Sequence, residues 1–392
     1  MKVLITTDWY SPAINGVVTS VINLQRELTA QGHEVRVLTL SHSPRSYRAG
    51  SVTYIGAISA GKIYPGARFR TAPARRLLTA LAQWRPDVIH SQCEFSTFLI
   101  ARKLAEVTDA ALVHTYHTVY EDYTHYFSPS RKWGRNAIAA FSRLVLSQTD
   151  AVIVPTEKVQ SILLRYRVEK PIYVVPTGLD VERFSHSADS TYLSILRQQL
   201  RIPARNFVLL YLGRLAEEKN IDLLLRCLAS LHREDITLLP VGNGPYRKEL
   251  ERQVSELHLE NQVVFAGMVK PDQVPNYYHL GDLFVSASTS ETQGLTYIEA
   301  LASGLPALCL RDPCLEGVIQ NDVNGWQFRD PVEFRAYLNR FLESQELRER
   351  MGLSAAESAR DHFSADAFAA HVAEVYREAI AQHRQRSETG AA

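Results

Sequence analysis

Two glutamates separated by eight positions are the part of the sequence whose types and spacing most clearly suggest chemistry. Glu291 and Glu299 lie in SETQGLTYIEALASGLPAL, where a glycine follows the first and an apolar, helix-like run carries the second. If a helix begins near Thr296, Gly294 and Leu295 offer free backbone N–H groups at its N-terminus, which is a ready site for an anion. Eight helical residues span roughly 12 Å.

That length is close to the distance from a sugar ring, past a diphosphate, to a ribose. One short element could therefore hold both ends of a nucleotide sugar. Glu291 would bind sugar hydroxyls, the N–H groups would bind phosphate, and Glu299 would bind ribose hydroxyls. The alternative is a surface loop and a buried helix that carry two incidental carboxylates, and the segment alone supports both interpretations.

Two basic residues follow an apolar run earlier in the same half of the chain. The run Phe207–Leu212 predicts a strand, and GRLAEEK comes directly after it, with Arg214 just past the strand and Lys219 just before the next helix. Arginine and lysine at a strand–helix turn can neutralise the charge that develops on a diphosphate leaving group. A charged surface turn is the alternative.

The chain alternates short apolar runs with longer amphipathic segments, which is typical of βαβ units on parallel sheets. In the first half we expect a helix at Val17–Gln31 and strands at Lys2–Thr7, Glu34–Leu40, Asp87–His90, Ala111–His114, Ala151–Val154 and Ile172–Val175. In the second half we expect a helix at Ile221–Leu231 and strands at Phe207–Leu212, Ile236–Val241, Val263–Ala266, Leu283–Val285 and Ala307–Leu310.

This repeated pattern predicts an α/β protein with two doubly wound, Rossmann-like domains that face a deep cleft. We place the domains at residues 1–185 and 186–365, followed by a segment at 366–392. In that segment a long helix, Asp366–Gln382, is expected to pack back toward the first domain. The small polar tail Ser387–Ala392 is expected to be disordered. Because ligands bind at the carboxyl ends of parallel strands, the loops there are the candidates for function.

Two such loops belong to the first half. The segment Ser11–Val18 carries Gly16, which could bring backbone amides close to phosphate or sugar, although an ordinary strand–helix turn has the same composition. The segment HTYHTVYEDY begins at the end of the strand Ala111–His114 and offers His117 to a sugar or an acceptor. Its spacing fits no paired metal ligands, so no metal site is expected. Glu94 could join it, whereas Glu121, Asp122 and His125 have an equally good interpretation as surface residues.

Two further turns are weaker signals. Val241–Pro245 contains a G-x-G without the third glycine or the acidic residue of a dinucleotide site, so we interpret it as a turn at the edge of the cleft. Pro176–Asp180 favours a purely structural crossover between the domains.

Charge is distributed unevenly although the chain is nearly neutral. Residues 1–150 hold 17 Lys/Arg and 10 Asp/Glu, which gives +7, and residues 151–392 hold 26 and 32, which gives −6. The stretch Val35–Pro86 has nine basic and no acidic residues. A second basic and aromatic cluster comprises Arg131, Lys132, Trp133, Arg135 and Arg143. Such mixtures suit an anionic membrane surface; nucleic acid or a merely solvated face are the alternatives.

Composition is that of a soluble globular protein, and no apolar run approaches the roughly 20 residues that span a bilayer. The N-terminal MKVLITTDWY predicts a strand and not a signal peptide. The four cysteines, Cys93, Cys227, Cys309 and Cys314, form no C-x-x-C pair, so free thiols in a reducing, cytoplasmic setting are expected.

Seven segments, in order along nearly the whole chain, resemble the family-four retaining glycosyltransferases of the GT-B fold. They are NGVVTSV, HTYHT, VPTGLD, GRLAEEKN, VGNGP, FAGMV and the Glu-x7-Glu of SETQGLTYIEA. Each is a weak signal alone, but the ordered set is specific. The resemblance implies a nucleotide-sugar donor and an enzyme of hexosyl transfer.

The resemblance also implies a role for individual residues. Arg214 and Lys219 would bind the diphosphate, Glu299 the ribose and Glu291 the transferred sugar. Four groups would complete the donor site: Gly294, Leu295 and Thr296 beside the phosphate, Gly16 closing on the donor, Met268 and Val269 at the base, and His117 beside the reacting carbon and the acceptor. No metal would be required, because the cations replace it.

Within that family, HTYHTVYEDYTHY and SETQGLTYIEALASGLP resemble bacterial diacylglycerol 3-α-glucosyltransferases, the monoglucosyldiacylglycerol synthases. This implies UDP-glucose as donor, diacylglycerol as acceptor, and a peripheral position on the inner face of the cell membrane, without nucleic acid as a partner. The basic N-terminal half is consistent with such a surface. One departure is Ser91 and Cys93 in SQCEFSTF, where relatives often carry His or Thr. The alternative within the family is a soluble or polyprenyl-linked glycan as acceptor.

Overall fold

The computed structural model describes residues 1–13, 15–59, 68–70, 74–119, 131–186 and 189–390, with the backbone alone for 59, 69, 70, 131–133, 389 and 390. The described chain divides into two compact units, Met1–Gly178 with Ala365–Ala392, and Leu179–Ser364. The chain passes from the first unit to the second after Gly178, a few residues before the boundary near residue 185 that the sequence suggested. Leu179, Val181 and Phe184 are already buried in the core of the second unit, which sets the crossing there.

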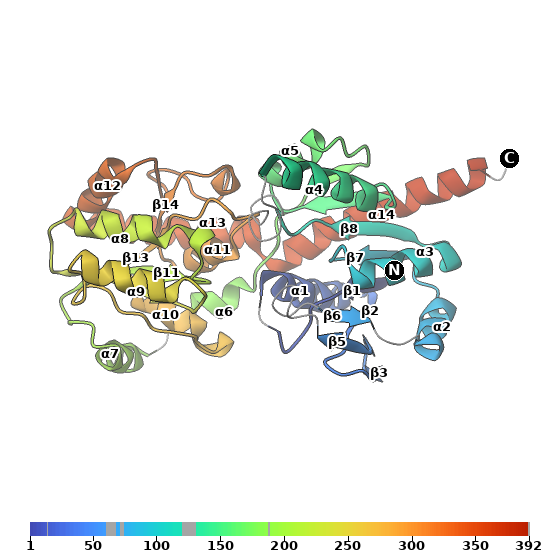
Figure 1. Cartoon of the computed structure of the whole chain (residues 1–392), viewed down its shortest axis with the longest axis horizontal. Coiled ribbons are helices and arrows are strands. Elements are labelled where there is room, and N and C mark those ends of the chain that lie inside the picture. The colour runs from blue at the N-terminus through green and yellow to red at the C-terminus, as the bar shows by residue number, and fades with distance from the viewer. Residues whose placement is uncertain (14, 60–67, 71–73, 120–130, 187–188, 391–392) are drawn as a thin grey trace. The chain divides into compact units, whose positions relative to one another are not determined.

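The first unit is built on a parallel sheet (Figure 1). Among the described residues, its eight strands run in the order β10 (Ile172–Val174), β9 (Ala151–Val154), β8 (Ala111–Thr115), β7 (Val88–Ser91), β1 (Lys2–Thr7), β2 (Glu34–Leu40), β4 (Val52–Ile55) and β3 (Tyr47–Ala49). Only β3 pairs antiparallel in this described sheet. A separate hairpin pairs β5 (Ala57–Ser59) with β6 (Arg68–Arg70).

Helices cover both faces of this sheet because alternate strand residues point to opposite sides. The helices of the unit are α1 (Gly16–Ala30), α2 (Arg75–Trp84), α3 (Ser96–Thr108), α4 (Arg131–Leu146), α5 (Glu157–Arg165) and α14 (Ala365–Gly390). On one face, Val3, Ile5 and Val113 pack against α1 and α14. On the other, Leu4 and Ile89 pack against α2 and α3, and a further cluster joins α4 and α5 to β9.

The second unit repeats the architecture. Its strands, five within the described residues, run β12 (Ile236–Val241), β11 (Phe207–Leu212), β13 (Leu283–Ser286), β14 (Ala307–Leu310) and β15 (Gly325–Phe328), all parallel. Its helices are α6 (Val181–Ser185), α7 (Ser190–Gln199), α8 (Ile221–Ala229), α9 (Arg247–Glu256), α10 (Val274–Leu280), α11 (Leu295–Ala302), α12 (Pro331–Glu343) and α13 (Gln345–Phe363), with 3-10 turns η2 (Glu217–Lys219), η3 (Pro271–Gln273) and η4 (Pro313–Leu315). Helices α8, α9 and α12 cover one face, and α6, α10, α11 and α13 the other.

The predicted strand at Val263–Ala266 is wrong. This segment lies beside the edge strand β12, with isolated bridges of Leu238 to Val263 and of Val241 to Gly267, and Ala266 N also donates to Pro240 O at 3.0 Å. Pro240 lies between the two bridges and has no N–H to donate, so a continuous ladder cannot form.

The expected disorder of the tail is also wrong for its described part, because α14 continues to Gly390. Residues 391–392 lie outside the described residues. Side chains near the end of α14 are tied to the rest of the unit: His383 lies 3.1 Å from both Asp109 Oδ1 and Asp150 Oδ2, and Arg386 pairs with Asp150 at 3.2 Å. These contacts stabilise the end of α14 as a helix, although the small, polar composition of the tail predicted disorder.

The loops that follow β11 and β12 are held against each other through their backbones. Gly213 N donates to Val241 O at 3.0 Å, Gly242 N donates to Gly267 O at 2.9 Å, and Leu215 N donates to Asn243 O at 3.1 Å. Gly242 has a φ of +133°, and a Cβ there would lie 2.0 Å from the carbonyl oxygen of Gly213. The VGNGP turn therefore serves close contact between two loops.

We expect Gly242→Ala to lower the melting temperature by several degrees more than Gly317→Ala. Both glycines have positive φ, but a Cβ at Gly317 meets nothing within 4 Å, so that variant isolates the backbone strain of about 1–2 kcal/mol. Gly242→Ala adds a collision with backbone that cannot rotate away. Differential scanning calorimetry of the three proteins measures the difference, and equal melting temperatures for the two variants would contradict it.

Candidate functional site

In the sheet of the second unit, the strand order reverses between β11 and β13. The helix that follows β11 covers one face of the sheet, and the helix that follows β13 covers the other. In open α/β sheets, ligands bind beyond the carboxyl ends of the strands at such a point. The loop after β11 carries Arg214 and Lys219, and the loop after β13 carries Glu291. The structure thus brings three of the predicted site residues to this point of one sheet.

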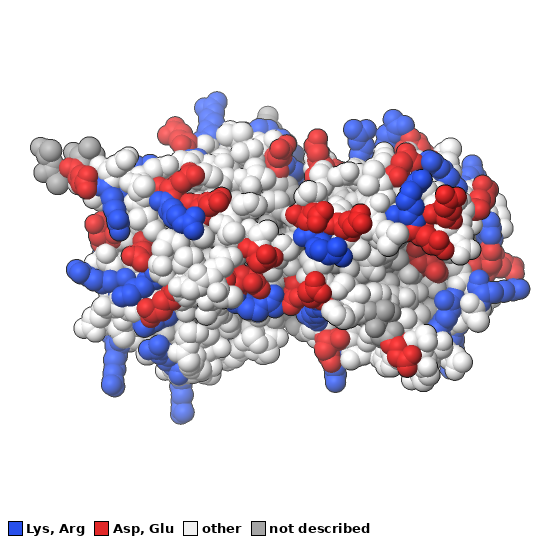
Figure 2. All heavy atoms as spheres, turned by 180° about the vertical axis from the view of Figure 1, so that it is seen from behind, with Lys and Arg blue, Asp and Glu red and all other residues white. Residues whose placement is uncertain are grey.

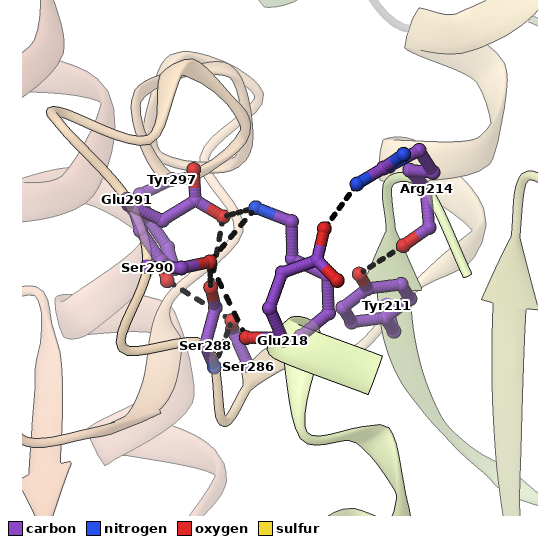
Figure 3. Close-up of polar contacts among 9 residues, drawn as sticks. Tyr211, Arg214, Glu218, Ser286, Ser288, Ser290, Glu291 and Tyr297 are labelled. Carbon is purple, nitrogen blue, oxygen red and sulfur yellow. Dashed lines mark hydrogen bonds and ion pairs between the residues drawn. The ribbon is translucent and has the colours of Figure 1, made fainter. Parts of the chain in front are cut away.

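Lys219 and Glu291 form an ion pair that joins the two loops (Figure 3). Lys219 Nζ lies 2.6 Å from Glu291 Oε1, and their side chains are only 13% and 23% exposed. Ser288 also donates to Glu291 Oε1, at 3.0 Å, and Ser290 Oγ lies 3.5 Å from the lysine nitrogen. The carboxylate is therefore oriented by a cation and a hydroxyl.

Arg214 is paired with Glu218 across one turn of the same loop (Figure 3). The Glu218 side chain is 7% exposed, and its Oε2 atom is buried without a hydrogen-bond partner among the described residues. The buried hydroxyl of Tyr211, on β11, donates to the Arg214 carbonyl at 3.1 Å and fixes the backbone that carries the guanidinium. The two cations of this site are thus each paired with a carboxylate: Arg214 with Glu218, and Lys219 with Glu291.

Helix α11 begins at this site with a left-handed glycine. Gly294 caps it at φ +73° and has no side chain with which to accept from the first N–H groups. A Cβ at Gly294 would lie 2.2 Å from the ring of Tyr297, whose hydroxyl is 3.0 Å from Ser286 Oγ on β13. The predicted helix over Thr296 is confirmed, and the N-terminus of a helix attracts anions.

Glu299 lies one turn along α11 and is hydrogen-bonded to a buried tyrosine. Tyr278 of α10 donates to Glu299 Oε2 at 2.7 Å and lies 3.2 Å from the carbonyl of Thr296. Burial raises the pKa of Glu299 to about 7, against the opposing effects of the Tyr278 hydroxyl and of Arg183. At neutral pH this carboxyl is therefore close to its titration point.

The segment predicted to meet a base follows Gly267. Met268 is 68% exposed, whereas Val269 packs against the core of the unit. Because Gly267 accepts the N–H of Gly242, this segment is linked through the VGNGP turn to the loop that carries Arg214.

The residues predicted in the first half lie in the first unit. Gly16 is exposed in the first turn of α1, where Asn15 Oδ1 accepts from the N–H of Val18 at 2.9 Å. His117 is half-buried beyond β8, and its Nε2 lies 2.6 Å from Oε1 of Gln92. Burial lowers the pKa of His117 to about 4, so this imidazole is neutral at neutral pH.

The remaining predicted residues have mixed outcomes. Glu94 contacts the HTYHTVYEDY segment as predicted, because its Oε1 lies 3.4 Å from Nε2 of His114, and its charge also acts on His117. Glu121, Asp122 and His125 lie outside the described residues, as do Lys62 and the side chains of Arg131, Lys132 and Trp133. All four cysteines are buried and stand outside any disulfide, as expected.

Several side chains that organise the site were not identified from the sequence. Glu218 could have been, because it lies four residues after Arg214, a spacing at which opposite charges pair. Ser288 and Tyr278 carried no such signal, since a hydroxyl becomes significant only once the fold brings it to a carboxylate. Across the described ranges, no three or more His, Cys, Asp or Glu side chains converge as metal ligands.

Comparison with known proteins assigns the family. The profile described as Glycosyltransferase Family 4 matches residues 14–183, and that described as Glycosyl transferases group 1 matches residues 194–358. The chain is 35% identical over 329 residues to alpha-monoglucosyldiacylglycerol synthase of Streptococcus pneumoniae, with 83% of this chain and 74% of the relative covered. The chain belongs to the family-four glycosyltransferases. The enzyme of the same name from Acholeplasma laidlawii is 30% identical over 357 residues, with 88% and 89% covered.

Solved structures place this glycosyltransferase in the GT-B fold. HepE of Anabaena, in complex with UDP, has a TM-score of 0.75 at 20% identity and covers 96% of this chain and 100% of its own. Sucrose-phosphate synthase of Thermosynechococcus elongatus has a TM-score of 0.76 at 20% identity, with 97% and 99% covered. The predicted fold of two Rossmann-like domains is confirmed.

The raised pKa of Glu299 gives a prediction for stability. Between the ordinary pKa of 4.5 and the folded value of about 7, the folded glycosyltransferase binds a proton that the unfolded chain has lost. This contribution to stability is therefore present at low pH and disappears as the pH rises to 7. We expect the melting temperature of Glu299→Gln to fall less than that of the wild type between pH 5 and pH 8, as measured by calorimetry. Parallel curves for the two proteins would contradict the prediction.

Proposed function

We propose that this glycosyltransferase moves a hexose, in the first instance glucose, from UDP-glucose to diacylglycerol at the cytoplasmic surface of the membrane, with retention at the anomeric carbon. The two relatives reported above carry the name alpha-monoglucosyldiacylglycerol synthase, which states both the sugar and the lipid. HepE, a neighbour in fold, has been solved with UDP-glucose.

The observation that carries the proposal is the convergence of Arg214, Lys219 and the N-terminus of α11 at one point of the second sheet. Each of the three is a partner for phosphate, and together they fit a diphosphate. Glu291 is anchored beside them, at the position proposed for the hydroxyls of the transferred sugar. Gly294, Leu295 and Thr296 would meet the phosphate through their backbone.

Beyond the diphosphate, we assign the ribose to Glu299 and the base to the backbone around Met268 and Val269. Glu299 can accept hydrogen bonds from two adjacent hydroxyls once it is ionised, and Tyr278 holds one of its oxygens. The roles of His117 beside the reacting carbon and of Gly16 beside the donor belong to the first unit and are supported by the family resemblance.

The proposed chemistry is direct transfer on one face of the sugar. As the bond from the anomeric carbon to the diphosphate breaks, Arg214 and Lys219 neutralise the charge on the departing oxygens. To do so, both cations leave their present carboxylate partners, Glu218 and Glu291. The acceptor oxygen bonds to the same face of the anomeric carbon, and its proton passes to the leaving phosphate. No metal ion is needed in this scheme, because the two cations supply the charge.

An exposed apolar patch of the first unit supports contact with a lipid surface. We call it the α3–α4 patch: Phe95, Leu99, Phe141 and Leu144, exposed by 54%, 60%, 37% and 64%. Phe95 and Phe141 stack at 5.9 Å, which makes the patch continuous from one helix to the other. The exposed Arg102, Arg135 and Arg143 lie on the same two helices. An apolar patch flanked by arginines fits an anionic bilayer.

The face shown in Figure 2 does not display a comparable basic surface. On the face shown in Figure 2, acidic and basic side chains are intermingled and no broad patch of one sign is present. Among the described residues, no helix is long and apolar enough to cross a bilayer. The proposal for the membrane therefore relies on the α3–α4 patch.

The test of the reaction is a donor screen with diacylglycerol in mixed micelles. We expect UDP-glucose to give an α-linked monoglucosyl lipid, and Lys219→Ala to lower kcat about 10²- to 10³-fold, because one charge-stabilising donor at the leaving group is lost. Lys248→Ala, which removes an exposed lysine of α9, is the matched control and should retain full activity. Product formation is followed by mass spectrometry and NMR.

Transfer to a soluble or polyprenyl-linked glycan, with none to diacylglycerol, would overturn the acceptor and leave the donor site standing. Lack of transfer from every UDP-hexose to any of these acceptors would overturn the function itself.

The α3–α4 patch predicts a separable binding defect. We expect the double variant Leu99→Ser, Leu144→Ser to lose most of its affinity for vesicles that contain phosphatidylglycerol, while it still transfers glucose to a short-chain, water-soluble diacylglycerol. Leu353→Ser is the control, since that leucine is 69% exposed on α13 in the second unit. Co-sedimentation at low salt measures binding, and equal binding of both variants would count against the patch.

A further inference from the structure

A buried polar chain connects helix α14 to His117. His90, on β7, is fully buried, and each edge of its ring meets a hydroxyl: Nδ1 lies 2.6 Å from Tyr376 of α14, and Nε2 lies 2.6 Å from Thr115 at the end of β8. The amide nitrogen of Gln92 lies 3.1 Å from both ring nitrogens, and the amide oxygen of Gln92 faces His117. These residues all belong to the first unit.

The direction of each hydrogen bond follows from the groups involved. Burial lowers the pKa of His90 well below its usual value, so the ring is neutral and has one N–H and one acceptor nitrogen. A phenol is a stronger donor than an aliphatic hydroxyl. Tyr376 therefore donates to Nδ1 of His90, and Nε2–H of His90 donates to Thr115.

This arrangement fixes the ring of His90 from both edges. Both ring nitrogens are then engaged, so the amide nitrogen of Gln92, at 3.1 Å from each, packs against the face of the ring and donates to neither nitrogen. With its nitrogen against His90, the amide presents its oxygen to His117 at 2.6 Å. An amide oxygen only accepts, so Nε2 of His117 carries the proton. In the neutral ring, Nδ1 of His117 is then left with a lone pair and can accept, but not donate, a hydrogen bond.

We propose that Tyr376 and His90 are positioning residues for His117, acting through the amide of Gln92 to hold it as the Nε2–H tautomer. The inference rests on the proposed function only for its catalytic consequence. Through Nδ1, His117 accepts a hydrogen bond from a hydroxyl of the sugar or of the acceptor. The last helix of the chain thereby contributes to a site whose other members come from β7 and β8.

The test compares two tyrosine hydroxyls, each of which forms a hydrogen bond between α14 and a strand of the sheet. Tyr376→Phe removes the hydroxyl next to His90. Tyr173→Phe is the matched control, because Tyr173 of β10 donates to Glu378 of α14 at 2.7 Å and contacts none of the residues named in the chain. Proteins labelled with ¹⁵N in the histidine rings report tautomers directly, and a His117→Asn variant assigns the His117 signals.

In the wild type and in Tyr173→Phe we expect a protonated Nε2 and an unprotonated Nδ1 at His117. In Tyr376→Phe both signals should move toward the average of the two tautomers, and kcat should fall about tenfold with the KM for the UDP-sugar unchanged, which corresponds to the loss of one hydrogen bond. If Tyr376→Phe does not fold, Gln92→Met, which removes the acceptor itself, should give the same change.

Unchanged His117 signals in Tyr376→Phe, or in Gln92→Met where that variant is used, would overturn the inference even if the glycosyltransferase glucosylates diacylglycerol. Shifted signals in a protein that uses no UDP-hexose would support the positioning role and reject the proposed function. The NMR and the transfer assay thus separate the two.

Discussion

A 2.6 Å ion pair between Lys219 Nζ and Glu291 Oε1 joins the loops that follow β11 and β13, and the site proposed for the donor depends on it. Both side chains are largely removed from water, so neither charge is tolerated there without the other. The pair therefore places the lysine and the carboxylate at once, and Ser288 limits the rotation of the carboxylate. In the proposed donor complex, an incoming diphosphate would have to compete with the carboxylates that already pair with Arg214 and Lys219.

The ion pair in turn relies on loops whose course is set by backbone contact. Gly213, Gly242 and Gly267 are connected by N–H to carbonyl bonds, and Gly242 leaves no room for a side chain. Gly294 does the same for α11, whose first turn packs the ring of Tyr297 where a Cβ would be. The functional side chains at this point of the sheet are thus positioned by glycines, because the lack of a Cβ lets backbone segments or an aromatic ring approach closely.

The sequence predicted what depends on local pattern. Strands such as Lys2–Thr7, Glu34–Leu40 and Phe207–Leu212 were placed at their observed bounds, because buried parallel strands are continuous apolar runs. Residues that act through distant partners were not predictable in this way. Tyr278 and Glu299 are 21 positions apart, and His90 and Tyr376 are 286 apart. No periodicity links such pairs, and only the fold shows that a tyrosine hydroxyl meets its acceptor.

The contribution of α14 to the first unit has a consequence for biosynthesis. Phe368, Val372 and Tyr376 complete the core around β1 and β8, yet they are translated after the whole second unit, Leu179–Ser364. On the ribosome, the N-terminal part of the chain must wait with one face of its sheet covered by α1 but not by α14, while the second unit already has every residue of its own core. In co-translational folding the N-terminal domain usually folds first, but here the first unit can complete its core only after the second unit has been synthesised. The first unit is therefore the part of the chain that requires protection by chaperones for longer.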